Sequence, residues 1–366
     1  MAEVRRARSV ALTESIQGVG AGKLRLQQPI HLDLQQRRTP YVQAVEIVMR
    51  NWVFAVGVTV WCSGVSAQQA TWQPSAGHAQ VPIWPGTAPD AKPFTGSETV
   101  KTDRNELVAG KSWIYIKNVS QPTMTVYSPT DKNTGAAVVV FPGGGYEILA
   151  IDLEGTEACD WLVSRGITCV LLKYRVPAQR SAPYFGAYPQ SPIALEDAQR
   201  TIGLVRLHAA EWHIDPHKIG VLGFSAGGHL VAATSVHFDH RLYPEVDAAD
   251  QQSCRPDFAI AIYPGHLSMR AGSLDLNPDI AAHITAQTPP TFLLQNEDDN
   301  VDSIWDSLAY YAALKKVGVP VEFHSYAEGG HAFGLRRTNF PATAWTQLVE
   351  LWLRTIGVTG DSSGAS

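Results

Sequence analysis

From residue 111 onward, apolar runs of strand length alternate with longer stretches whose apolar positions recur at helical spacing. The predicted strands are 114–119, 123–129, 136–142, 168–175, 218–224, 258–264, 291–296 and 321–327. The predicted helices are 154–165, 193–212, 226–236, 307–318 and 342–356. Because the two kinds of element alternate, we predict the α/β class, with one domain whose mostly parallel central sheet carries helices on both faces.

The strand predicted at 136–142, AAVVVFP, is apolar almost without interruption, as a strand buried on both faces should be. We find no internal repeat and no second block of alternating elements. Residues 111–358 are therefore predicted to form the single α/β domain. The Pro- and Gly-rich stretch 68–110 is predicted to be an irregular lead-in, and 359–366 to be a flexible tail.

Residues 49–67 have the pattern of a signal peptide. Met49 and Arg50 precede a short apolar run, which ends in the small residues of an A-x-A-like cleavage site at 65–67. A buried helix or a membrane anchor is the alternative, but the run is short for a bilayer span. We therefore predict export to the periplasm or the exterior, with no stable membrane insertion after cleavage. On this hypothesis translation begins at Met49, and residues 1–48 are upstream sequence.

The charge and cysteine content narrow the range of functions. The 366 residues include 29 Lys and Arg against 34 Asp and Glu, a net charge of −5. Without a basic excess to neutralise phosphates, no nucleic-acid partner is expected.

Four cysteines are too few for a disulfide-dense scaffold, and spacing alone does not show whether Cys159 and Cys169 form a bridge. No histidine pair has a third ligand nearby, so we expect no metal site and no cofactor. The oligomeric state is not predicted.

A G-x-S-x-G pattern, Gly223-Phe224-Ser225-Ala226-Gly227, lies between the predicted strand 218–224 and the predicted helix 226–236. The pattern places a serine on a sharp turn from strand to helix, where its neighbours must be small. The N–H groups at the start of the helix then face the same site. Ser225 is the predicted nucleophile, and the N–H group of Ala226 is a predicted oxyanion donor.

A second glycine loop, FPGGGYE, follows the buried strand 136–142. Glycines allow backbone N–H groups to approach a substrate oxygen, and this loop occupies the position of the HGGG oxyanion motif, with Pro142 in place of its His. We predict that Gly144 or Gly145 donates to the oxyanion together with Ala226. A simple tight turn is the alternative.

The predicted base and acid follow two later strands. A serine hydroxyl needs a base to remove its proton, and histidine titrates near neutrality. His331 follows the last predicted strand, and a carboxylate must orient its ring. Several acids follow the strand 291–296, of which we choose Asp299 first, Asp302 second and Asp298 third. The chain order Ser, Asp, His is that of α/β-hydrolases.

The stretch from about Val81 to Val358 resembles α/β-hydrolases of the exported carbohydrate-esterase type, such as acetylxylan and feruloyl esterases. They are related to dienelactone-hydrolase-like and prolyl-oligopeptidase-like enzymes. The matching motifs are FPGGGY, DLEGTEACDWL, VLLKYRVP, EDAQR, IGVLGFSAGG, NEDDNVD and GGHAFGLR. The resemblance implies that 111–358 is a hydrolase catalytic domain, that its acid is Asp299, and that its substrate is an acylated carbohydrate or a small ester.

We therefore predict a serine carboxylesterase that removes acetyl or feruloyl groups from xylan-type polysaccharide or its oligosaccharides through an acyl-enzyme. A prolyl-oligopeptidase-type peptidase, a small-ester or lipid esterase, and a catalytically silent binding protein are the alternatives. Four aromatic residues are candidates for substrate binding, although the last three could equally cover their own loop. They are Tyr146, Tyr184, Phe185 and Tyr188.

Overall fold

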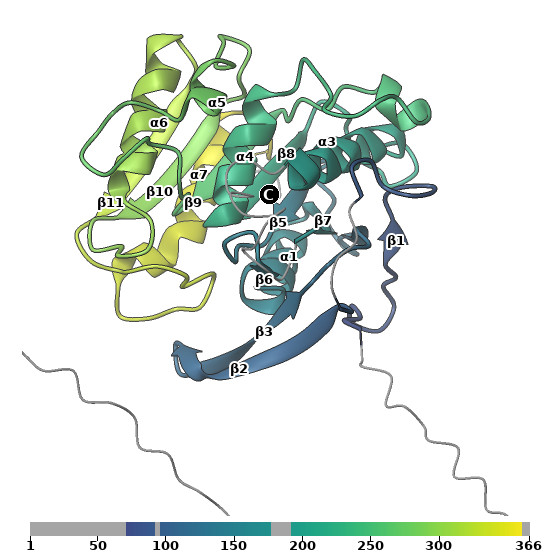
Figure 1. Ribbon diagram of the computed structural model, residues 1–366, viewed down its shortest axis with the longest axis horizontal. Helices are drawn as coiled ribbons and strands as arrows, with labels where there is room; N and C mark the ends of the chain where they lie inside the picture. The colour runs from purple at the N-terminus through teal and green to yellow at the C-terminus, as the bar shows by residue number, and fades with distance from the viewer. Residues whose placement is uncertain (1–70, 92–95, 177–191, 361–366) are drawn as a thin grey trace, which may run out of the picture. The chain divides into compact units, whose positions relative to one another are not determined.

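The computed structural model describes residues 71–91, 96–176 and 192–360 (Figure 1). These residues all belong to one compact unit, Val65–Ser366. Within these ranges, no helix has the length and apolar character needed to cross a membrane.

Several predictions concern residues outside the described ranges. They include the upstream segment 1–48, the signal peptide 49–67, most of the flexible tail, and the aromatic candidates Tyr184, Phe185 and Tyr188. Export and the role of these aromatic side chains therefore stay predictions.

An eight-stranded sheet forms the centre of the unit, in the order β1-β4-β7-β5-β8-β9-β10-β11. The pairs from β7 to β11 are parallel, whereas β4 pairs antiparallel with both β1 and β7. This arrangement confirms the predicted mostly parallel sheet. The strands are β1 (Val81–Pro82), β4 (Thr123–Tyr127), β5 (Ala137–Phe141), β7 (Thr168–Lys173), β8 (Ile219–Phe224), β9 (Phe258–Ile262), β10 (Thr291–Asn296) and β11 (Val321–Tyr326).

Helices cover the sheet, and every residue of β5, β7, β8, β9 and β10 is buried. In Figure 1, α4 and α6 lie in front of the strands and α7 lies behind them. The rings of Trp161 and Trp345 pack with centroids 5.3 Å apart and join α1 to α7. The helices are α1 (Glu157–Ser164), α3 (Pro192–Leu207), α4 (Ala226–Val236), α5 (Pro278–Ala281), α6 (Ile304–Lys316) and α7 (Trp345–Thr355).

A second, three-stranded antiparallel sheet corrects one prediction. It consists of β2 (Thr99–Val108), β3 (Lys111–Lys117) and β6 (Ile148–Leu149) in the order β2-β3-β6. The irregular lead-in predicted for 68–110 is therefore wrong over β2, and also over the two-residue edge strand β1 of the central sheet. Most β2 residues are exposed and none is fully buried. Because β2 buries neither face, its sequence lacks the alternation of apolar and polar residues by which a strand is predicted. Backbone hydrogen bonds to β3, and not side-chain burial, stabilise this strand.

Two predicted helices begin with a different helical geometry. The helix expected at 154–165 starts as a π-helical turn, η1 (Asp152–Thr156), and continues as α1. The helix expected at 342–356 starts as a 3₁₀ turn, η3 (Pro341–Ala344), and continues as α7. A further 3₁₀ turn is η2 (Ala248–Gln251). The π-helical turn buries the Glu154 side chain, and such turns are frequent at functional sites.

A disulfide between Cys159 and Cys169 joins α1 to β7. The bridge that spacing alone left open is therefore present in the structure. Cys254 is buried and carries a free thiol.

A buried ionic network connects the segment before β2, through Trp84 and Pro89, to Arg175, which lies just after β7. Asp197 on α3 accepts a hydrogen bond of 2.8 Å from the Trp84 ring N–H and one of 2.9 Å from the Arg175 backbone N–H. The Arg175 guanidinium contacts Asp197 and, at 2.9 Å, Glu196. Burial raises the pKa of the Asp197 carboxyl, although the Arg175 charge opposes it. The EDAQR motif therefore contributes a structural anchor.

Replacing Asp197 with alanine should lower the free energy of unfolding by about 3–5 kcal/mol, because the buried Arg175 charge loses its main partner. Urea unfolding of the purified protein measures the change. Asp131→Ala, at an exposed loop position, is the matched control and should shift stability by less than about 0.5 kcal/mol. Equal, small effects of the two substitutions would contradict the anchoring role.

Candidate active site

Ser225 occupies the turn between β8 and α4, with φ 52° and ψ −119°. Few residues other than glycine adopt a positive φ, and such backbone strain is concentrated at functional sites. The turn needs glycine on both sides. A Cβ at Gly223 would clash with the Gly227 carbonyl, and one at Gly227 would clash with the Phe141 carbonyl of β5. Close backbone packing therefore holds the serine at the end of the strand.

The structure brings together the three residues chosen as nucleophile, base and acid. His331 Nε2 lies 3.0 Å from Ser225 Oγ, and His331 Nδ1 lies 2.7 Å from Asp299 Oδ2. Asp299 accepts further hydrogen bonds from the Gln295 side chain at 3.1 Å and from the N–H groups of residues 301 and 302 at 3.0 Å each. These contacts fix the carboxylate, which can in turn orient the imidazole to accept a proton from the serine.

The other two candidate acids take different positions. Asp302 Oδ2 lies 3.3 Å from Ser225 Oγ and 3.7 Å from His331 Nε2, on the side of the ring away from Asp299. Asp298 accepts hydrogen bonds from the N–H groups of Gly329 and Gly330 and so supports the loop that carries His331. Of the three acids, Asp299 is the one that contacts Nδ1.

Three carboxylates surround the His331 imidazole and set its charge balance. Burial alone would lower the His331 pKa, but the hydrogen bond and charge of Asp299, with the charges of Asp302 and Glu154, raise it above its ordinary value. Burial raises the pKa of Asp302 to about 6, against the opposing charge of His331.

The buried carboxylate of Glu154 holds the glycine loop after β5 in place through a hydrogen bond. The Gly143 N–H donates to Glu154 Oε2 at 2.8 Å, so this N–H group already has a partner inside the protein. Glu154 Oε1 accepts a hydrogen bond of 2.8 Å from the Tyr263 hydroxyl. That hydroxyl in turn accepts one of 3.0 Å from the Gly334 N–H, just beyond His331. Glu154 thus connects the predicted oxyanion loop to the histidine loop.

The sequence pattern around Glu154 predicted a helix over 154–165 and formed part of the resemblance, but it did not reveal this role. Glu154 is 2% exposed, and burial raises its pKa. A carboxylate is costly to bury unless it is hydrogen-bonded. Because Asp152 and Glu157 lie close by in the chain, nothing in the local pattern singles out Glu154 as the buried acid.

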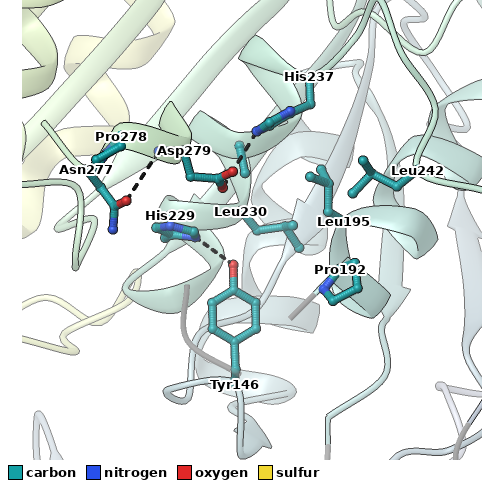
Figure 2. A pocket seen from close by; sticks show the side chains of 11 residues that line it. Tyr146, Pro192, Leu195, His229, Leu230, His237, Leu242, Asn277, Pro278 and Asp279 are labelled. Carbon is teal, nitrogen blue, oxygen red and sulfur yellow. Dashed lines mark hydrogen bonds and ion pairs between the residues drawn. The ribbon is translucent and has the colours of Figure 1, made fainter. Parts of the chain in front are cut away.

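A cavity of about 550 Å³ borders the glycine loop and α4 (Figure 2). One wall is polar: the Tyr146 hydroxyl lies 2.9 Å from His229 Nδ1, and His237 lies 3.7 Å from Asp279. Burial lowers the pKa of His229 to about 3, so its ring is neutral. The opposite wall is apolar. The lining residues are Tyr146, Pro192, Leu195, His229, Leu230, Ala233, His237, Leu242, Asn277, Pro278 and Asp279.

Tyr146 is the aromatic candidate that the described residues include, and it lines this cavity beside the oxyanion loop. Its side chain is 5% exposed, with the hydroxyl directed at His229 (Figure 2). Among the residues that the structure describes, no group of three His, Cys, Asp or Glu side chains could hold a metal ion.

Comparison with known proteins gives the family. The BD-FAE family model matches residues 124–264. The acetyl ester-xyloside bifunctional hydrolase from Caldicellulosiruptor lactoaceticus is 32% identical, with a TM-score of 0.60, over 77% of this chain and 97% of that one. The chain belongs to the α/β-hydrolase carbohydrate esterases. This α/β-hydrolase also resembles the thermophilic esterase Est2 of Thermogutta terrifontis, at 27% identity and a TM-score of 0.56 over 68% of this chain and 92% of that one.

Two curated relatives of this α/β-hydrolase are longer proteins. An acetylxylan esterase of Xylanibacter ruminicola is 27% identical over 62% of this chain and 46% of its own length. Endo-1,4-beta-xylanase B of Butyrivibrio fibrisolvens is 28% identical over 60% of this chain and 36% of its own length. The chain thus spans less than half the length of these two relatives.

Replacing Glu154 with alanine should lower kcat by roughly tenfold to a hundredfold, because Gly143 and Tyr263 lose the group that holds the oxyanion loop. Glu154→Gln keeps an acceptor and should retain much more activity. Steady-state kinetics on a small acetyl ester, with circular dichroism as the folding control, measures the difference. Equal losses in the two variants would show that the hydrogen-bonding geometry is not what matters.

The pH profile follows from the raised His331 pKa. The imidazole accepts a proton only when neutral, so kcat/KM should fall as the pH drops through a value above about 6.5, the ordinary histidine pKa. Removing the Asp299 charge in Asp299→Asn should move the residual acid limb to lower pH. A limb that stays in place in this variant would rule out His331 as the group that titrates.

Proposed function

We propose that the protein is a serine carboxylesterase with Ser225 as nucleophile, His331 as general base and acid, and Asp299 as the orienting carboxylate. The observation that carries the proposal is the position of His331, within hydrogen-bond distance of Ser225 Oγ through Nε2 and of Asp299 through Nδ1. This is the geometry that acyl transfer through a serine requires.

In the proposed reaction, Ser225 Oγ attacks the ester carbonyl while His331 Nε2 takes its proton. The N–H groups of Ala226 and of Gly144 or Gly145 stabilise the developing oxyanion, at about 3 kcal/mol for each such donor in comparable sites. His331 then protonates the departing alcohol oxygen as the C–O bond breaks. Water attacks the acyl-enzyme by the same route, which releases the carboxylic acid and restores the serine.

We propose acetyl or feruloyl groups on xylan-type polysaccharide or its fragments as the substrates. The acetyl assignment is supported by two relatives, one named as an acetylxylan esterase and one as an acetyl ester-xyloside hydrolase. The xylanase name of another relative is not transferred, since the chain covers only 36% of that protein.

Replacing Ser225 with alanine should lower ester hydrolysis by about a thousandfold or more while the fold is retained. Acetylated xylan, a feruloyl ester and a peptide amide are assayed side by side, with Ser164→Ala at an exposed position of α1 as the control. Hydrolysis of the peptide amide alone would contradict an esterase.

An organophosphate tests the nucleophile independently of substrate choice. Esterase 2 of Thermogutta terrifontis, 25% identical with a TM-score of 0.56, is known in a form phosphorylated by paraoxon. Paraoxon should add one phosphoryl group to the present protein at Ser225, detected by mass spectrometry, and none to Ser225→Ala. An unlabelled wild-type protein would indicate a silent binding protein.

A further inference from the structure

Asp302 is a second carboxylate in direct reach of the reacting atoms, and the proposed mechanism gives it no role. Its Oδ2 lies 3.3 Å from Ser225 Oγ and 3.7 Å from His331 Nε2. The residue is 6% exposed. A Cβ at Gly265, in the loop after β9, would clash with this carboxylate, so the chain provides room for it there.

Within the described ranges, the charged or titratable side chains that act on Asp302 are Ser225, His266, Asp299, Asp306 and His331. His331 and Ser225 face Oδ2, while His266 Nε2 lies 3.9 Å from Oδ1, and its side chain is 59% exposed. The charges of Asp299 and Asp306 act in the same direction as burial and disfavour the ionised form. The carboxylate therefore lies between the reacting atoms and the more exposed His266.

The position of Asp302 creates competition for one proton. The Ser225 hydroxyl carries a single hydrogen, which it can donate to His331 Nε2 at 3.0 Å or to Asp302 Oδ2 at 3.3 Å. Donation to Asp302 directs the proton away from the base. A second donor that satisfies Asp302 would leave the serine proton to His331.

We propose that Asp302 determines specificity for the leaving alcohol, by accepting a hydrogen bond from a hydroxyl group on the carbon next to the ester oxygen. The ester oxygen must lie near His331 Nε2 to receive its proton, which brings a neighbouring hydroxyl within reach of Oδ2. Carbohydrates and other polyols carry such a hydroxyl, whereas simple alkyl esters do not. This inference rests on the proposed esterase function and narrows its substrate class to esters of vicinal diols.

Two esters that differ only at this hydroxyl test the proposal: ethylene glycol monoacetate and its methyl ether. Their kcat/KM values are measured for the wild type and Asp302→Asn at about pH 8, above the Asp302 pKa of about 6. The wild type should prefer the glycol ester by at least about tenfold, the range expected for a hydrogen bond to a charged group. Asp302→Asn should lower this preference to roughly a few-fold, because its neutral amide oxygen still accepts a hydrogen bond but a weaker one than the carboxylate.

Glu297→Gln is the matched control, because it removes a negative charge from the same strand-end loop at an exposed position. This control should keep the wild-type preference. Asp302→Ser serves as a second variant should the asparagine protein fail to fold, with circular dichroism as the check. It should lower the preference as well.

The pH profile of methyl ether hydrolysis gives a readout that a purely structural residue would not move. The Asp302 charge raises the His331 pKa, so its removal should shift the acid limb of kcat/KM to lower pH.

A wild type with no preference for the glycol ester would overturn the role of Asp302, and so would a preference that stays at the wild-type level in Asp302→Asn. In both cases ester hydrolysis that depends on Ser225 would leave the proposed function intact. Hydrolysis of both esters that persists in Ser225→Ala would instead overturn the proposed function, and this inference with it.

Discussion

The parallel pairing of β8, β9, β10 and β11 is the constraint on which the site depends. Parallel strands present their carboxyl ends along one edge of the sheet, and ligand sites in open α/β sheets form there. Ser225 follows β8, Asp299 follows β10 and His331 follows β11. The strand pairing therefore brings Ser225 and His331, more than one hundred positions apart in the chain, to the same edge, and the loop contacts set the 3.0 Å between Oγ and Nε2.

The charges of three carboxylates, Asp299, Asp302 and Glu154, raise the pKa of the His331 imidazole. Each carboxylate also contacts a different group elsewhere in the site. Asp299 is held by Gln295 and by backbone N–H groups, so it is fixed and orients the ring. Glu154 is bound to Gly143 and Tyr263, so its effect on His331 acts through charge and loop geometry. Asp302 contacts the serine hydroxyl itself. Charges interact strongly in a buried site, so all three carboxylates help to keep the His331 pKa high, although only Asp299 is hydrogen-bonded to Nδ1.

The motifs singled out in the sequence have two kinds of role: some lie in the active site, and others stabilise the fold around it. The two glycine motifs and the histidine loop contribute atoms to the site, whereas EDAQR contributes Asp197 and Glu196 to a buried anchor around Arg175. The segment DLEGT belongs to both groups, because its π-helical turn places the buried Glu154 carboxylate against Gly143 of the predicted oxyanion loop. The resemblance to carbohydrate esterases therefore includes residues that hold the site as well as residues that form it.

The sequence by itself determined the fold class, the nucleophile and the base as predictions. Continuous apolar runs mark buried parallel strands, and Ser225 and His331 each lie in a local pattern just after one of them. The acid could only be ranked, since Asp298, Asp299 and Asp302 all follow β10 and spacing does not tell which way each side chain points. Only the tertiary structure placed Asp299 against Nδ1, Asp302 against the serine and Asp298 on the histidine loop. It also decided the exposed strand β2, the partners of Glu154 and the Cys159–Cys169 bridge, because these depend on contacts between segments that leave no period in the chain.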